Sequence, residues 1–248
     1  VIPLVAPFFL QTRLRKHISQ CSRSMFALFS KPSKMLPESE CLKGREKPIP
    51  GAPDKGAKHY VFKTPLYPHF AKGSEMISLG MGCFWCSESL FWDTKGVIST
   101  HVGYQQGVTP NPTYKEVCSG NTNHNEVTRI VYDPKVCSLS TILKIFFESH
   151  NPTQHMGQGN DRGTQYRSGL YYYNKDQKPV IEAQLTAYQK ALKEQGHGEI
   201  ATEVLPAEKF YYAEEYHQQY DAKPGSRQYC GLRPLQVSMP KVEGKSNI

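Results

Sequence analysis

The chain has 248 residues, of which 38% are hydrophobic, 21% charged and 11% aromatic, a composition typical of a globular protein and not of a disordered or fibrous one. This length suits one domain with extensions or two small domains, and it can bury a sizeable core without disulfides. No apolar run approaches the ~18 residues that a membrane-spanning helix needs. Seven cysteines are too few for a disulfide-dense secreted scaffold.

The formal net charge of +8 is concentrated near the N-terminus. Residues 1–37 contain six basic and no acidic side chains, whereas the remainder has 24 basic and 22 acidic ones. A nucleic-acid-binding domain needs a basic stripe on its folded part, so this distribution does not favour nucleic-acid binding. The basic leader is typical of a mitochondrial transit peptide and equally of an unstructured tail. Because Met25 and Met35 are candidate starts, we expect a mitochondrial location, a cytoplasmic one or both, depending on the true start.

Residues 38–73 are punctuated by proline and glycine, which predicts a linker with little buried surface. A folded domain over residues 74–232 and a flexible tail over 233–248 are expected to follow. The predicted elements, in chain order, are a strand at 76–79, a helix at 84–92, strands at 99–104 and 126–132, a helix after Ser138 or Ser140, a strand at 168–173, a helix ending at Gly196 and a half-buried strand at 199–204. Strands and helices without strict alternation predict an α+β fold, with helices packed on a mixed sheet and an irregular C-terminal tail.

The segment 82–88 (GCFWCSE) contains the most specific chemical signal. Cys83 follows a predicted strand and begins a predicted helix, where unpaired N–H groups and the helix dipole favour a thiolate. Phe84 and Trp85 come next and are suited to walling an apolar pocket. From spacing alone, a reactive nucleophile and a buried free cysteine remain equally open.

Cys83 and Cys86 also form a C-x-x-C pair, a spacing typical of a redox couple or of half a zinc site. Zinc needs a second ligand pair with compact spacing. Neither Cys118 with His124 nor Cys137 with His150 provides one. We therefore predict no metal site. No dinucleotide fingerprint is present, so we also expect no bound nicotinamide or flavin.

The segment at Cys83 resembles the signature of the peptide methionine sulfoxide reductase A family, and further segments resemble the same family in the expected order. The resemblance spans residues 75–232. The matching segments are 82–85 (GCFW) with Glu88, 102–104 (VGY), 111–120 (NPTYKEVCSG), 124–127 (HNEV), 132–134 (YDP), 151–154 (NPTQ), 158–168 (QGNDRGTQYRS), 213–218 (AEEYHQ) and 229–231 (YCG). It implies a ferredoxin-like α/β roll and an enzyme that reduces methionine S-sulfoxide, free and in proteins.

The resemblance also implies roles at the reacting sulfoxide. Cys83 attacks the sulfur, and Glu126 donates a proton to the oxygen, which requires a carboxyl kept protonated by burial. Tyr114 and Tyr166 match the phenols that hold the sulfoxide oxygen. Asp161 matches an acidic residue of the same pocket. Without the resemblance, Glu126 reads as a solvated strand residue, the two tyrosines as packing residues and Asp161 as a turn residue.

Phe84 and Trp85 match residues that clamp the terminal methyl group of the substrate. Attack leaves a sulfenic acid on Cys83, and Cys230 matches the resolving cysteine that captures it in a Cys83–Cys230 disulfide. Thioredoxin, or dithiothreitol in vitro, then restores the thiols. Glu88 belongs to the signature, and we expect it to form a structural salt bridge or hydrogen bond.

The chain departs from the family pattern at its cysteines. Many members have glycine where this chain has Cys86, a thiol that can itself capture the sulfenic acid. No cysteine follows Cys230, so a three-cysteine relay is not expected. Two other functions remain open: a general thiol–disulfide oxidoreductase using Cys83 and Cys86, and a non-catalytic module that binds Met-like side chains and senses oxidants. We expect a monomer whose partners are thioredoxin and oxidised proteins, with no membrane association.

Overall fold

The computed structural model describes residues 33–226 and 230–242. Most of the leader predicted at residues 1–37 therefore lies outside the described residues. No helix in the described part of the chain is both long and apolar enough to cross a membrane.

A mixed sheet forms the centre of the domain, with strand order β7-β6-β1-β3-β2-β8. All neighbouring strands in it run antiparallel except β6 and β7, which are parallel. The small pair β4 and β5 forms a separate antiparallel ladder. The strands are β1 (Glu75–Met81), β2 (Val97–Gln105), β3 (Asn125–Tyr132), β4 (Gly157–Gln158), β5 (Asp161–Arg162), β6 (Ser168–Tyr172), β7 (Glu203–Pro206) and β8 (Tyr211–Tyr212).

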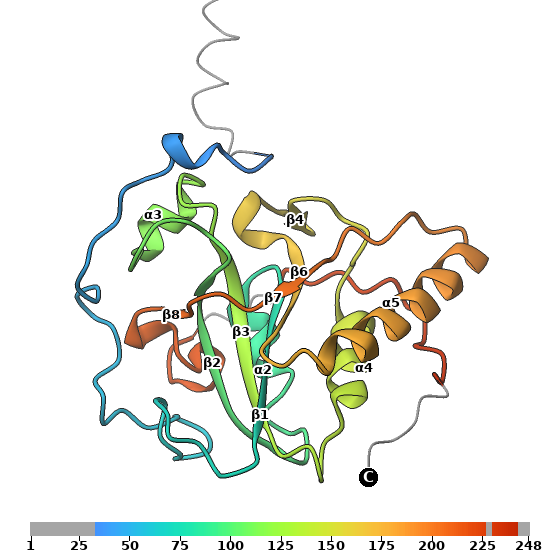
Figure 1. The fold of residues 1–248 in the computed structure, drawn as a ribbon, viewed down its shortest axis with the longest axis horizontal. Helices are drawn as coiled ribbons and strands as arrows, with labels where there is room; N and C mark the ends of the chain where they lie inside the picture. Colours follow the sequence, from blue (N-terminus) through green and yellow to red (C-terminus); the bar gives the residue numbers. More distant parts are fainter. Residues whose placement is uncertain (1–32, 227–229, 243–248) are drawn as a thin grey trace, which may run out of the picture. The chain divides into compact units, whose positions relative to one another are not determined.

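The helices complete an α+β architecture, as predicted. They are α2 (Phe84–Ser89), α3 (Tyr114–Cys118), α4 (Leu139–Ser149) and α5 (Gln177–Glu194), with 3-10 turns at Glu38–Glu40, Thr164–Tyr166, Glu215–His217 and Tyr220–Ala222. Figure 1 shows α4 and α5 side by side against the sheet. Ser138 caps α4 by accepting a hydrogen bond from Thr141 N–H at 3.1 Å, which decides between the two candidate caps.

The helices α2, α4 and α5 share one face of the sheet. Because side chains alternate along a strand, Ile77 and Leu79 of β1 and Ile130 of β3 point into a common core with Phe146 and Leu192 of the two long helices, and all five are fully buried. This core fixes the end of β1, where Cys83 follows.

Aromatic rings cover a buried arginine on the opposite face of the sheet. The guanidinium of Arg129 lies over the rings of Phe210 at 4.0 Å and Tyr212 at 5.0 Å. Its Nε donates to His101 at 3.3 Å. Burial, with the nearby charge of Arg129, lowers the pKa of His101 well below its usual range, so His101 accepts as a neutral ring.

Residues 38–73 are mostly exposed, as expected of a linker, but a few of them are buried against the domain. Ile49 is 6% exposed, and His59 and Leu66 are fully buried. Arg45 pairs with Glu116 of α3 at 2.5 Å, and this guanidinium holds the pKa of the carboxyl at about 2. Proline and glycine do indicate irregular backbone, but the apolar residues between them pack on the domain.

The described part of the C-terminal tail is irregular, as predicted, but it is packed and not free. Val237 is 2% exposed. Tyr188 of α5 donates its hydroxyl to the Val237 carbonyl at 3.1 Å, and Glu148 of α4 accepts from Met239 N–H at 2.7 Å. The tail therefore crosses both long helices, contrary to the expectation of flexibility over 233–242.

Several elements differ from their predicted bounds. The helix expected at 84–92 ends at Ser89. The strand expected at 199–204 is instead β7, which begins at Glu203, and its residue Leu205 is 40% exposed. α3, β4, β5 and β8 were not predicted, because elements of two to five residues carry too little hydrophobic periodicity to detect.

Candidate active site

Cys83 lies at the turn between β1 and α2, as the sequence predicts. It is the N-cap residue of α2 and is partly exposed. Gly82 precedes it with a φ of +91°, and a Cβ there would lie 2.6 Å from Cβ of Gln158. Only glycine tolerates both the positive φ and this close contact, so Gly82 allows the turn to pack closely against β4.

Three thiols meet at this turn. The sulfur of Cys86 is hydrogen-bonded with the thiols of Cys83 and Cys230 and with the backbone of Gly231. The hydrogen bond from Cys83 is the main cause that lowers the pKa of Cys86 to about 7. The hydrogen bond to Cys86, burial and the negative charge of Glu126 all raise the pKa of Cys83. Burial also raises the pKa of Cys230.

The pKa of Cys83 is raised in the protein without substrate, whereas the helix end was expected to favour the thiolate. The hydrogen bond with Cys86 and burial are the larger causes, and the negative charge of Glu126 adds to them. The N-terminus of α2, a helix of six residues, does not offset these effects.

Glu126 and two phenols surround the same position. Glu126 of β3 is 2% exposed, and its Oε2 accepts from the backbone N–H of Phe84 at 3.3 Å. Burial, followed by the charge of Glu126, raises the pKa of both Tyr114 and Tyr166. Cys83 contributes to the same effect on Tyr114. The structure thus brings the predicted nucleophile, acid and phenols into one cluster.

An aromatic wall stands beside the sulfur. Phe84 is 1% exposed, and its ring lies 5.9 Å from Tyr104 and 5.1 Å from His217. Trp85 stacks between His217 and Tyr220, with ring centroids 5.5 Å and 4.1 Å away. Its indole N–H donates to His217 Nδ1 at 2.9 Å. Phe84 and Trp85, which were predicted to clamp the methyl group of the substrate, are therefore held in place by these ring contacts.

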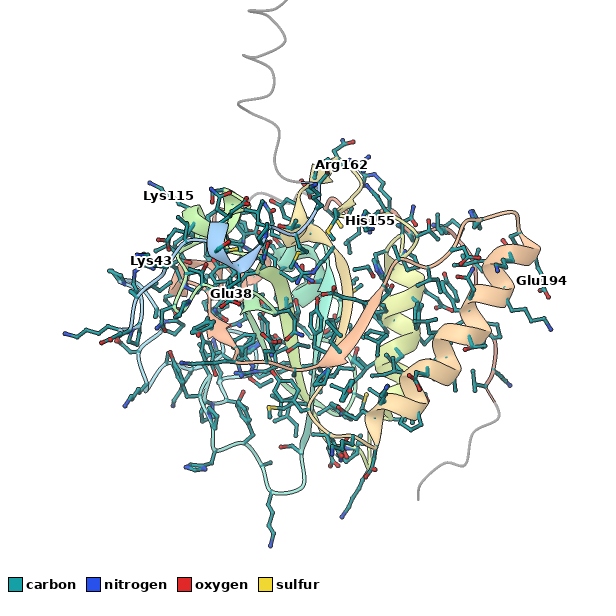
Figure 2. All side chains as sticks on the ribbon, turned by 45° about the horizontal axis from the view of Figure 1, so that its top comes forward. Glu38, Lys43, Lys115, His155, Arg162 and Glu194 are labelled. Carbon is teal, nitrogen blue, oxygen red and sulfur yellow. The ribbon has the colours of Figure 1, made fainter. Side chains whose placement is uncertain are left out.

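Asp161 lies at the edge of the cluster. It is partly exposed on β5 and adds a small contribution to the raised pKa of Tyr166. Figure 2 shows Lys115 of α3 and Arg162 of β5 at the same end of the domain. Lys115 follows Tyr114 and Arg162 follows Asp161, so α3 and the β4–β5 pair lie at the end of the domain where these two candidate residues are found.

The segment 213–218 contains two site residues to which the sequence analysis assigned no role. Glu214 accepts from Tyr114 N–H and from the Tyr104 hydroxyl, both at 3.0 Å. His217 is fully buried, and burial lowers its pKa to about 3, so the ring is neutral and accepts from Trp85. The signal was present, because both residues belong to a segment that matches the family.

Glu88 forms hydrogen bonds, one of the two contacts expected of it. It is fully buried and accepts from Gln219 N–H at 2.7 Å, from Gln219 Nε2 at 2.7 Å and from the Thr100 hydroxyl at 2.8 Å. Burial outweighs these bonds and raises its pKa to about 7. Glu88 therefore fixes α2 to the segment that carries His217.

Among the described residues, no group of three or more His, Cys, Asp or Glu side chains is arranged to hold a metal ion. A surface hollow of about 730 Å³ is lined by Glu215 and residues of the segment 51–58, and it contains none of the predicted site residues.

Comparisons with known proteins agree with the site. The family model described as peptide methionine sulfoxide reductase matches residues 75–245. The chain is 52% identical over 215 residues to peptide methionine sulfoxide reductase MsrA 1 of Synechocystis sp., covering 87% of this chain and 95% of that protein. It is 54% identical over 218 residues to MsrA 2 of Nostoc sp., covering 86% and 95% respectively.

Solved structures have the same fold. Methionine sulfoxide reductase A of Corynebacterium diphtheriae aligns with a TM-score of 0.67 and 37% identity, over 81% of this chain and 99% of that one. Mxr1 from Saccharomyces cerevisiae in reduced form aligns with a TM-score of 0.58 and 32% identity, over 70% and 96%. The chain belongs to the peptide methionine sulfoxide reductase family and is an oxidoreductase that reduces methionine sulfoxide.

Proposed function

We propose that the chain reduces the S epimer of methionine sulfoxide, free and in oxidised proteins, by attack of Cys83 on the sulfur. The observation that carries this proposal is the cluster of a thiol, a buried carboxyl and two phenols around one position. Separate enzymes act on the two sulfoxide epimers, and family membership supports the S epimer.

Glu126 is the proton donor in this mechanism. A sulfoxide oxygen is a poor leaving group unless it is protonated, and a bound sulfoxide would complete the burial of a carboxylate that is already only 2% exposed, which favours uptake of the proton that Glu126 then donates. Tyr114 and Tyr166 hold the oxygen by hydrogen bonds. The thiol and the sulfoxide are converted to a sulfenic acid on Cys83 and a thioether, so atoms and electrons balance.

The aromatic wall selects the substrate. Phe84 and Trp85 bury the terminal methyl group, for which aromatic faces provide a large apolar contact. Asp161, at the edge of the cluster, binds the backbone of the oxidised residue. His217 supports this arrangement by holding the indole of Trp85.

Cys230 provides the disulfide sulfur that an external reductant attacks. It is exposed at the end of the thiol cluster, so a disulfide that includes its sulfur is open to attack by a dithiol protein. We propose thioredoxin as that reductant, with dithiothreitol as its substitute in vitro.

The test uses a peptide containing methionine S-sulfoxide, with dithiothreitol as reductant. Wild type should form methionine, Cys83→Ser should form none, and the R epimer should not react. Cys41→Ser is the matched control, because Cys41 donates to the Pro37 carbonyl in the N-terminal segment. Methionine formation by Cys83→Ser refutes the mechanism. Reduction of insulin disulfides that depends on Cys86 supports the thiol–disulfide oxidoreductase, and retention of the peptide without consumption of reductant supports the binding module.

Location and assembly are further proposals. The basic, acid-free composition of residues 1–37 supports a mitochondrial form, and an internal start at Met25 or Met35 supports a cytoplasmic one. Imaging of fluorescent fusions that begin at Val1, Met25 or Met35 tests this. We also propose a monomer, which size-exclusion chromatography with light scattering would check.

A further inference from the structure

The three thiols of the site form a row from the interior to the surface. Cys86 is 2% exposed and is hydrogen-bonded with the thiols of both Cys83 and Cys230. Cys83 faces the carboxyl and phenols, whereas Cys230 is exposed. Cys86 is therefore placed between the sulfur that meets the substrate and the sulfur that meets the solvent.

The local backbone allows Cys83 and Cys86 to bond to each other. Cys83 is the N-cap residue of α2 and Cys86 is its third helical residue. The side chain of an N-cap residue normally faces the backbone of that third residue, so the two sulfurs can approach without unwinding the helix. The thiol hydrogen bond of Cys230 goes to Cys86.

We propose that Cys86 relays the oxidation from Cys83 to Cys230, so that the disulfide offered to the external dithiol joins Cys86 and Cys230. This inference rests on the sulfoxide reductase function proposed above. It assigns a role to the thiol that departs from the family pattern, and it returns Cys83 to the thiol state before the reductant binds. A relay through three cysteines was not expected from the sequence, because no cysteine follows Cys230, but here the third thiol is Cys86, which precedes it and contacts it.

The steps balance. The Cys86 thiol attacks the sulfenic sulfur of Cys83, forms the Cys83–Cys86 disulfide and releases water. The Cys230 thiolate then attacks the Cys86 sulfur, so a Cys86–Cys230 bond forms, the Cys83–Cys86 bond breaks, and Cys83 leaves as a thiolate that takes up a proton. An external dithiol attacks Cys230, releases Cys86 and supplies the two electrons that the sulfoxide consumed.

The acidity of Cys86 supports the last step, its release by the external dithiol. In the reduced protein the hydrogen bond with Cys83 is the main cause that lowers the pKa of Cys86 to about 7, and a thiol of low pKa is a good leaving group. In the exchange before it, geometry and not acidity selects the sulfur that is attacked, because the Cys230 thiol hydrogen-bonds with Cys86.

The main test needs no mutation. Wild-type protein without reductant is treated with an excess of a methionine S-sulfoxide peptide, quenched in acid, alkylated and mapped by mass spectrometry. The relay predicts a Cys86–Cys230 disulfide and about two methionines per chain, because the regenerated Cys83 reacts a second time. A Cys83–Cys230 disulfide with Cys86 alkylated and about one methionine per chain would overturn it.

Variants separate the steps. Cys230→Ser should stop at a Cys83–Cys86 disulfide. Cys86→Ser should accumulate a sulfenic acid on Cys83, trapped by dimedone, and its turnover with thioredoxin should fall by about tenfold or more. Wild-type turnover in Cys86→Ser contradicts the relay. Cys41→Ser again serves as the control and should behave as wild type.

The two proposals fail in different ways. If wild type forms no methionine from the sulfoxide peptide, the reductase mechanism fails. If methionine forms but the bridge joins Cys83 to Cys230, only the relay fails.

Discussion

Replacing Glu126 with glutamine should slow sulfoxide reduction and at the same time make Cys83 more reactive. The amide is nearly isosteric, and its oxygen can still accept from Phe84 N–H, the contact that Glu126 makes at 3.3 Å. Loss of a general acid costs about 10²-fold or more, which corresponds to about 2.7 kcal/mol of transition-state stabilisation. Loss of the negative charge removes one of the causes that raise the pKa of Cys83, so the thiolate fraction near neutral pH rises.

The assay has two arms. Single-turnover methionine formation should fall by about 10²-fold or more, while iodoacetamide alkylation of Cys83, followed by mass spectrometry, should accelerate. Glu214→Gln is the control, because this carboxyl also lies in the pocket wall but contacts Tyr104 and Tyr114 and not the thiols. Unchanged single-turnover reduction in Glu126→Gln would discard the acid role. Slower alkylation of that variant would show that the substitution had disrupted the site instead of neutralising it.

Three further predictions concern the residues that hold the site. His217→Phe keeps the ring but leaves the indole N–H of Trp85 buried without its acceptor, so the free energy of unfolding should fall by about 1–3 kcal/mol in urea denaturation. Glu88 has a folded pKa of about 7, above its unfolded value near ~4.5, so its stabilising contribution is complete below pH ~4.5 and is lost as the pH rises through about 7; urea denaturation across this range should show a steeper fall for wild type than for Glu88→Gln. Arg167 is 4% exposed and pairs with Glu203 at 2.8 Å, and it also donates to the carbonyls of Asn123, Thr164 and Gln106. Arg167→Met leaves these buried acceptors without their donor, so it should cost about 1–3 kcal/mol or more in thermal or urea unfolding, whereas Glu203→Gln keeps an oxygen that can accept and should cost clearly less.

The nucleophile turn was predictable because its determinants are local. A buried strand, a glycine with a positive φ and an apolar helix start lie within a few residues of Cys83, and each is visible in the sequence. The cap at Ser138 and the end of α5 before Gly196, which has a φ of +78°, follow from equally local rules.

The packing of the two ends of the chain was not predictable in this way. Residues 38–73 contain the proline and glycine of a linker, and only the neighbouring surface shows that Leu66 and His59 are buried. The tail beyond Cys230 lacks any periodicity, yet Val237 occupies a place between the long helices. Whether an isolated apolar residue is buried depends on the surface against which it packs in the folded protein. A sequence pattern does not show that surface.

The class of fold and the candidate nucleophile follow from the amino-acid sequence, and the candidate residues around that thiol follow from its resemblance to a family. How these groups affect one another's pKa values, and which thiols are in contact, depends on the folded arrangement. Besides the hydrogen bond with Cys86 and burial, a carboxylate that folding places beside Cys83 from β3 raises the pKa of that thiol, and Cys86 lies between two thiols because the distant tail returns to α2. Both outcomes arise from charges and sulfurs that are far apart along the chain and become neighbours only in the folded protein.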